Sequence, residues 1–71
     1  MANEIKLLRF LAQDMTQAEL GKRVGLTRQT IAAIEQERYS PTLDVAFRIA
    51  HVFGKRIEDV FHWTPPEGGS G

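Results

Sequence analysis

The stretch TQAELGKRVGLTRQTIAAIE, residues 16–35, decides the fold of this chain. Its first half begins with Thr16 and has Glu19 three positions later, the spacing of a capping box at the start of a helix. Apolar residues then recur at helical spacing, and Gly25 follows where a left-handed residue ends a helix. This half therefore predicts a short helix over residues 17–24.

The second half of the stretch has the signals of another short helix. Leu26 fills the turn, and Thr27 is a residue type that caps helix N-termini. Ile31 and Ile34 then fall on one face of a helix predicted over residues 28–36. Two short helices joined by a glycine turn have the spacing of a DNA-binding helix-turn-helix.

The outward face of the second helix carries the chemistry of base recognition. With the two isoleucines facing the core, the exposed side chains are Arg28, Gln29, Ala32 and Ala33. Arginine can bond guanine, glutamine can bond adenine, and a methyl group can pack on the methyl of thymine. A solvated helix face has a similar composition, so the preceding turn is needed to interpret these four residues as a base-reading surface.

The stretch resembles the Cro and phage-repressor type of helix-turn-helix, the XRE-like family. The matching positions are Gln17, Gly21, Gly25, Ile31 and Ile34. The resemblance extends over residues 4–62, and TRQTIAAIE followed by RYSPTLDVAFRIAHVFG is similar to small single-domain members. It implies an all-α, five-helix lambda-repressor-like DNA-binding domain with the helix-turn-helix at its second and third helices.

Helix N-termini and the family resemblance together predict the phosphate contacts. Helix N-termini bind anions through free backbone N–H groups. The expected phosphate-binding residues are Thr16, Gln17, Thr27, Arg38, Tyr39 and Ser40. The resemblance also implies an ion pair between Arg9 and Glu35, although Arg9 precedes Gln17 by one residue more than in most members. Glu37 stands where relatives usually have glycine, and a residue other than glycine costs energy there if the backbone is left-handed; an ordinary helical residue is the alternative.

The remaining helices are predicted from caps and apolar spacing. Asn3 can cap a first helix that ends near Ala12, a fourth helix begins at a Ser40 or Thr42 cap, and Ile57–Phe61 forms a fifth. Core candidates outside the helix-turn-helix are Ile5, Leu8, Leu43, Ala46, Phe47, Ala50, Phe53, Val60 and Phe61. Phe10 and Leu11 are expected to complete the core under the last helix, with a partner surface as the alternative.

Composition limits the function classes. Nine basic and nine acidic residues cancel, so the location of charge must decide whether nucleic acid is a partner. The absence of cysteine excludes disulfides and suits a cytoplasmic location, and we expect no signal peptide or membrane helix. His51 and His62 lack the company of other metal ligands, and no catalytic motif is present. We expect no enzyme activity, no cofactor, no metal site and no small-molecule ligand.

The sequence therefore predicts sequence-specific binding of double-stranded DNA by residues 1–63, as a transcriptional repressor. A homodimer on a roughly palindromic site is expected, with its interface at Phe61 and Trp63. Residues 64–71 are predicted to be a disordered tail, in which GGSG is typical of an artificial linker. Two alternatives stay open: a protein-interaction module on the same fold, and an engineered DNA binder. Lys55 and Arg56 fit either a solubilising loop or an added phosphate contact.

Overall fold

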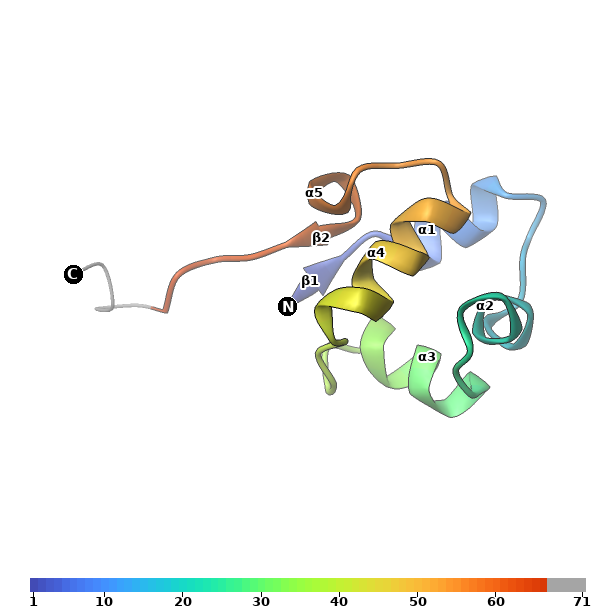
Figure 1. Cartoon of the computed structure of the whole chain (residues 1–71), viewed down its shortest axis with the longest axis horizontal. Helices are drawn as coiled ribbons and strands as arrows, with labels where there is room; N and C mark the ends of the chain where they lie inside the picture. Colours follow the sequence, from blue (N-terminus) through green and yellow to red (C-terminus); the bar gives the residue numbers. More distant parts are fainter. Residues whose placement is uncertain (67–71) are drawn as a thin grey trace.

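The computed structural model describes residues 1–66, which form a small helical domain (Figure 1). Its five helices are α1 (Ile5–Leu11), α2 (Gln17–Val24), α3 (Arg28–Glu35), α4 (Leu43–Val52) and α5 (Ile57–Val60). Two short strands, β1 (Ala2–Asn3) and β2 (Phe61–His62), pair antiparallel and join the two ends of the described chain. The all-α, lambda-repressor-like fold is confirmed, with this two-stranded sheet as an addition.

The predicted caps hold the helix-turn-helix in place. The Thr16 hydroxyl accepts a hydrogen bond from the Glu19 N–H at 3.0 Å, and the Thr27 hydroxyl accepts one from the Thr30 N–H at 3.2 Å. Gly25 ends α2 with φ +80°. The capping box is half formed, because the Glu19 carboxylate bonds Arg23 one turn later at 2.7 Å.

Gly21 explains how closely the turn packs on α2. It is buried, and a Cβ placed on it would lie 2.5 Å from the carbonyl oxygen of Leu26. That oxygen belongs to the backbone of the turn, so a larger residue would push the turn and the start of α3 away from α2. The small residue at this position therefore sets the angle between the two helices.

One apolar core lies between the helices, and α4 lies on the side of the domain that faces the viewer in Figure 1. It comprises Ile5, Leu8, Met15, Leu20, Val24, Ile31, Ile34, Ala46, Ile49, Ala50, Val60 and Phe61. Ile31 and Ile34 are fully buried, as their place on the inner face of α3 predicted. Val60 and Phe61 close the core from the C-terminal side, also as predicted.

Two predictions about the core, which concern four residues, were wrong. Leu43 and Phe47 are exposed, and the buried stripe of α4 is rotated toward Ile49. Phe10 and Leu11 are exposed on α1 instead of lying under the last helix. The physical reason is that α1 and α4 are apolar over more than one face, so helical spacing alone does not decide which face is covered.

The N-terminus of α1 also differs from the prediction. Asn3 lies in β1, and Glu4 occupies the cap position. The Asn3 side chain still accepts a bond from the Ile5 N–H at 3.2 Å, and its amide donates to the Ile34 carbonyl at 2.9 Å. Asn3 therefore ties the N-terminus to the end of α3. The GGSG segment predicted as a linker lies outside the described residues.

Candidate nucleic-acid interface

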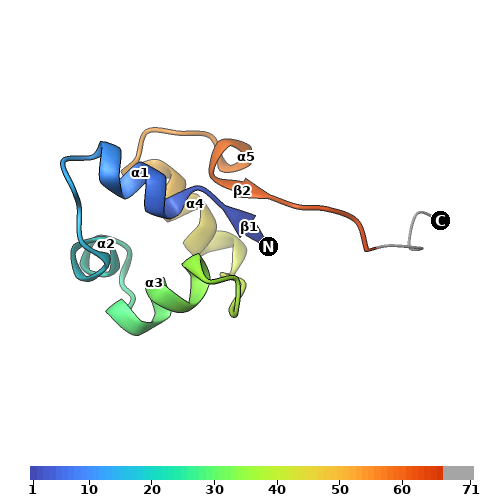
Figure 2. The same ribbon diagram turned by 180° about the vertical axis from the view of Figure 1, so that it is seen from behind.

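The outer face of α3 carries the four side chains predicted to read bases. Arg28 and Gln29 are exposed, while Ala32 and Ala33 are half-buried beside them. In both views α3 lies along one margin of the domain, and α1 and α5 lie toward the opposite margin (Figures 1 and 2). The structure thus brings these four residues together on a convex edge with two long polar groups and two methyl groups.

The predicted phosphate-binding residues lie at two helix starts and one loop. Thr16 and Gln17 begin α2, and Thr27 caps α3. Arg38, Tyr39 and Ser40 are exposed in the loop that follows α3. The hydroxyls of Thr16 and Thr27 accept cap bonds from backbone N–H groups, and the Thr16 hydroxyl retains a donor hydrogen for another acceptor. The Thr27 hydroxyl also shares a hydrogen bond with the Thr30 hydroxyl at 2.9 Å, in which either oxygen can be the donor.

The arginines of residues 1–66 differ in whether they form an ion pair with a carboxylate. Four of them pair with a carboxylate: Arg9 with Glu35, Arg23 with Glu19, Arg48 with Asp44 and Arg56 with Glu58. Arg28 on α3 and Arg38 in the following loop have no ion pair within this part of the chain. Although the formal net charge of the chain is zero, two guanidinium groups at α3 and in the loop after it therefore have no carboxylate partner within residues 1–66.

A polar network beneath α3 holds it against α1 and α2. The Arg9 guanidinium donates to both carboxylate oxygens of Glu35, at 2.6 and 3.0 Å, and to the Met15 carbonyl at 2.8 Å. The Gln17 amide donates to Glu35 at 3.1 Å. The predicted Arg9–Glu35 pair is confirmed. Sequence reasoning missed the bond from Gln17, which leaves one of its two amide hydrogens for a phosphate.

The end of α3 positions the loop that carries Arg38. Glu37 has φ +62°, so of the two possibilities that the sequence left open the backbone is left-handed. Its neighbour Arg38 donates its N–H to the Ala33 carbonyl at 2.9 Å, which closes the last turn of α3. Gln13 and Asp14, between α1 and α2, are also left-handed, with φ +60° and +58°, and no glycine signalled them in the sequence.

Lys55 and Arg56 lie in the connection between α4 and α5. This connection is at the margin of the domain opposite α3 in both views (Figures 1 and 2). Arg56 pairs with Glu58 at 2.8 Å. The position favours the solubilising-loop interpretation over a phosphate contact on the duplex that α3 would meet.

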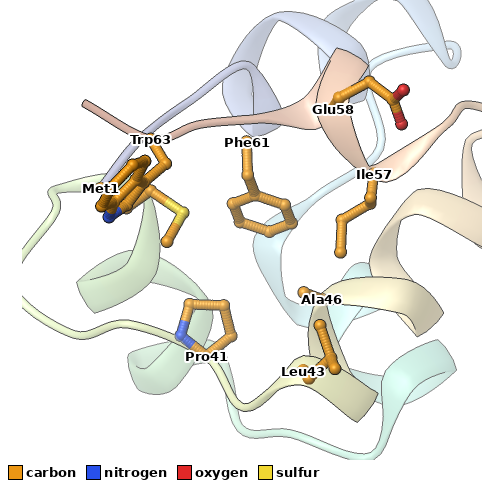
Figure 3. A pocket seen from close by; sticks show the side chains of 8 residues that line it. All are labelled: Met1, Pro41, Leu43, Ala46, Ile57, Glu58, Phe61 and Trp63. Carbon is orange, nitrogen blue, oxygen red and sulfur yellow. The ribbon is translucent and has the colours of Figure 1, made fainter. Parts of the chain in front are cut away.

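An apolar hollow lies beside the C-terminal strand (Figure 3). Its lining comprises Met1, Pro41, Leu43, Ala46, Ile57, Glu58, Phe61 and Trp63. Phe61 is buried and forms part of the core, so it offers little surface to a partner. Trp63 is 69% exposed and stands next to Met1 at one end of the hollow (Figure 3).

Residues 1–66 offer neither a metal site nor a membrane-spanning helix. No group of three or more His, Asp or Glu side chains in this range is arranged to hold a metal ion. None of its helices has the length and apolar character needed to cross a membrane.

The sequence was also compared with known proteins. The family model described as "Helix-turn-helix" matches residues 5–60. An uncharacterized HTH-type transcriptional regulator of Methanocaldococcus jannaschii is 46% identical over 67 residues, which cover 94% of this chain and 100% of the relative. The HTH-type regulator YgzD of Bacillus subtilis is 45% identical over 67 residues, covering 94% of this chain and 98% of the relative. Since the family model matches residues 5–60 and these relatives match over nearly their whole length, the chain belongs to the XRE-like helix-turn-helix family of DNA-binding transcriptional regulators.

Proposed function

We propose that this chain binds double-stranded DNA sequence-specifically by placing α3 in the major groove. Arg28 and Gln29 would bond base edges, and Ala32 and Ala33 would let the helix approach closely and pack on thymine methyl groups. The observation that carries the proposal is the exposure of Arg28 and Gln29 on this face, together with the absence of a carboxylate partner within residues 1–66 for Arg28 and for Arg38 in the following loop.

Phosphate contacts would fix the register of α3 in the groove. Thr16, Gln17 and Thr27 present side-chain donors and backbone N–H groups at two helix starts. Arg38, Tyr39 and Ser40 extend this set along the loop after α3. Contacts of this kind carry affinity and orientation, whereas the bases are read by the helix itself. Gln17 would also link a phosphate to Glu35, and through it to the position of α3.

The proposed functional unit is a homodimer on a roughly two-fold symmetric site. One short recognition helix reads only a few base pairs, and two copies about one DNA turn apart, ~34 Å, double the length that is read. Trp63 and the apolar hollow beside it supply the exposed surface for this contact, with Phe61 as its floor. Aromatic side chains of this size dominate many interfaces.

The proposed biological role is repression in the cytoplasm. A dimer seated on an operator would exclude polymerase from the same DNA without a small-molecule ligand. The relatives are named as HTH-type transcriptional regulators, which supports a role in transcription. The family consists of DNA-binding regulators, so catalysis is not part of this proposal.

A salt series on a gel shift tests DNA binding itself. The chain is titrated into a random duplex pool at low salt, the bound fraction is sequenced, and the enriched site is measured from low to physiological salt. We expect one enriched motif and an affinity that falls steeply with salt, because Arg38 and the helix starts displace counterions from phosphates. No retained duplex at low salt would favour a protein-interaction module on the same fold.

A further inference from the structure

The outer face of α1 is apolar and uncovered in the described structure. Leu7, Phe10 and Leu11 are 52%, 65% and 66% exposed. Their i, i+3, i+4 spacing makes them neighbours on one helical surface. Three such side chains side by side form a patch of the kind that marks a contact with another protein.

The side of α1 that carries Leu7 and Leu11 faces away from the outer face of α3. Arg9 lies on the side of α1 that contacts α3, where it bonds Glu35. Residues two positions apart on a helix lie about 200° apart, so Leu7 and Leu11 project from the opposite side of α1. Figure 2 shows α1 near the margin of the domain opposite α3. A partner on this patch would leave the outer face of α3 free.

Two opposite charges flank the patch at equal sequence distances. Lys6 precedes Phe10 by four residues and Asp14 follows it by four, and all three line one surface hollow together with Arg9, Met15 and Thr16. Both charged side chains are exposed, and neither has an ion pair within residues 1–66. In an antiparallel contact with its own copy, with Phe10 on the two-fold axis, each Lys6 would meet the Asp14 of the other copy. Such a contact is self-complementary, as a two-fold interface requires.

We propose that a second copy of this chain docks antiparallel on the α1 patch, back to back, and that this contact joins two separate DNA sites. The inference rests on the proposed DNA binding, because each copy presents its α3 outward to a different duplex. Three apolar side chains on each copy make an interface smaller than a stable complex requires, so the free contact is weak. DNA that holds several copies close together raises their effective concentration, so that the weak contact can form.

Cysteine crosslinking tests the arrangement without DNA. The chain has no cysteine, so Lys6→Cys and Asp14→Cys variants each carry a single thiol. In a mixture of the two, the antiparallel contact brings one thiol against the other while the second Lys6–Asp14 pair stays intact. We expect disulfide dimers between the two variants to form at least about five-fold faster than dimers of either variant with itself. A His51→Cys variant on α4 mixed with Asp14→Cys is the matched control.

A charge exchange tests the contact on DNA. An immobilised duplex with the enriched site captures a second, fluorescent duplex through the protein. Lys6→Glu and Asp14→Lys should each lower capture about five-fold, and the two together should restore it to within about two-fold. Binding of each variant to one duplex should remain unchanged, and Lys55→Glu in the α4–α5 connection should leave capture unchanged.

The outcomes separate this inference from the proposed function. Loss of binding to a single duplex in the unsubstituted chain would refute the DNA-binding proposal, while the crosslinking experiment would still report on the α1 patch. Normal single-duplex binding with no capture, or equal crosslinking in all mixtures, would overturn the back-to-back contact. A crosslinked dimer that binds one inverted repeat more tightly and captures no second duplex would also overturn it.

Discussion

Arg9 and Glu35, twenty-six positions apart, form a two-point ion pair between α1 and the end of α3, with N–O distances of 2.6 and 3.0 Å. The two side chains are only 15% and 7% exposed. Glu35 also accepts a bond from Gln17, so one carboxylate joins the helices that begin and end the helix-turn-helix. This carboxylate therefore helps to fix the orientation of α3, the helix that we propose reads the bases.

Breaking this pair should destabilise the fold. Glu35→Ala leaves the Arg9 guanidinium largely buried with only the Met15 carbonyl as acceptor. We expect the free energy of unfolding to fall by about 3 kcal/mol, since an unpaired buried charge loses its compensation. The double substitution of Arg9→Met with Glu35→Leu should lower the free energy of unfolding by less than the sum of the decreases caused by the two single substitutions. Urea denaturation measures all variants, and strictly additive losses would show that the pair is not coupled.

Removing the side chain at the left-handed end of α3 should stabilise the protein. Glu37 has φ +62°, a conformation that glycine adopts without steric cost. Glu37→Gly should raise the free energy of unfolding by up to about 1 kcal/mol, and it removes a negative charge near Arg38, so DNA affinity should rise or stay level. The adjacent Gln36→Gly is the control, because φ is −85° there and glycine should lower stability. Thermal melts in which Glu37→Gly is less stable would contradict the account.

Much of the site could be predicted from sequence because its signals are local. The Thr16 and Thr27 caps, the glycine turn and the inner isoleucines each depend on a few neighbouring residues, and all were confirmed. For Glu37 the sequence left two possibilities open, and the left-handed one is observed. These features need no knowledge of how distant segments pack.

The errors concern long-range packing and surplus apolar surface. On α4, Leu43 and Phe47 form one apolar stripe, whereas Ala46, Ile49 and Ala50 form another, and only the packed neighbours decide which is buried. Strands of two residues are too short to show an alternating pattern, so β1 and β2 gave no signal. Phe10 is an apolar residue of the type usually found in a core, yet it is exposed. The spacing of apolar residues in the sequence does not reveal this exposure.

Half-site spacing should control affinity if the functional unit is a dimer held at the C-terminal hollow. A duplex with two inverted half-sites at the enriched spacing should bind cooperatively, and a shift of half a turn, about 5 base pairs, should abolish cooperativity because it rotates one copy to the opposite side of the duplex. Trp63→Ala should remove the same cooperativity while single half-site binding is retained. Phe47→Ala, another exposed aromatic residue, is the control. Equal affinity at both spacings would reject the dimer.

The most direct test of the central claim is the base preference of Arg28→Ala, obtained by selection from a random duplex library and compared with the unsubstituted chain. If α3 reads bases, Arg28→Ala should lose about 1–3 kcal/mol on the preferred site and relax the preference at one or two adjacent base pairs. Gln17→Ala, at the start of α2, should weaken binding to all sequences more evenly and leave the selected motif intact. A motif that Arg28→Ala leaves unchanged would contradict the assignment of α3 as the base-reading helix.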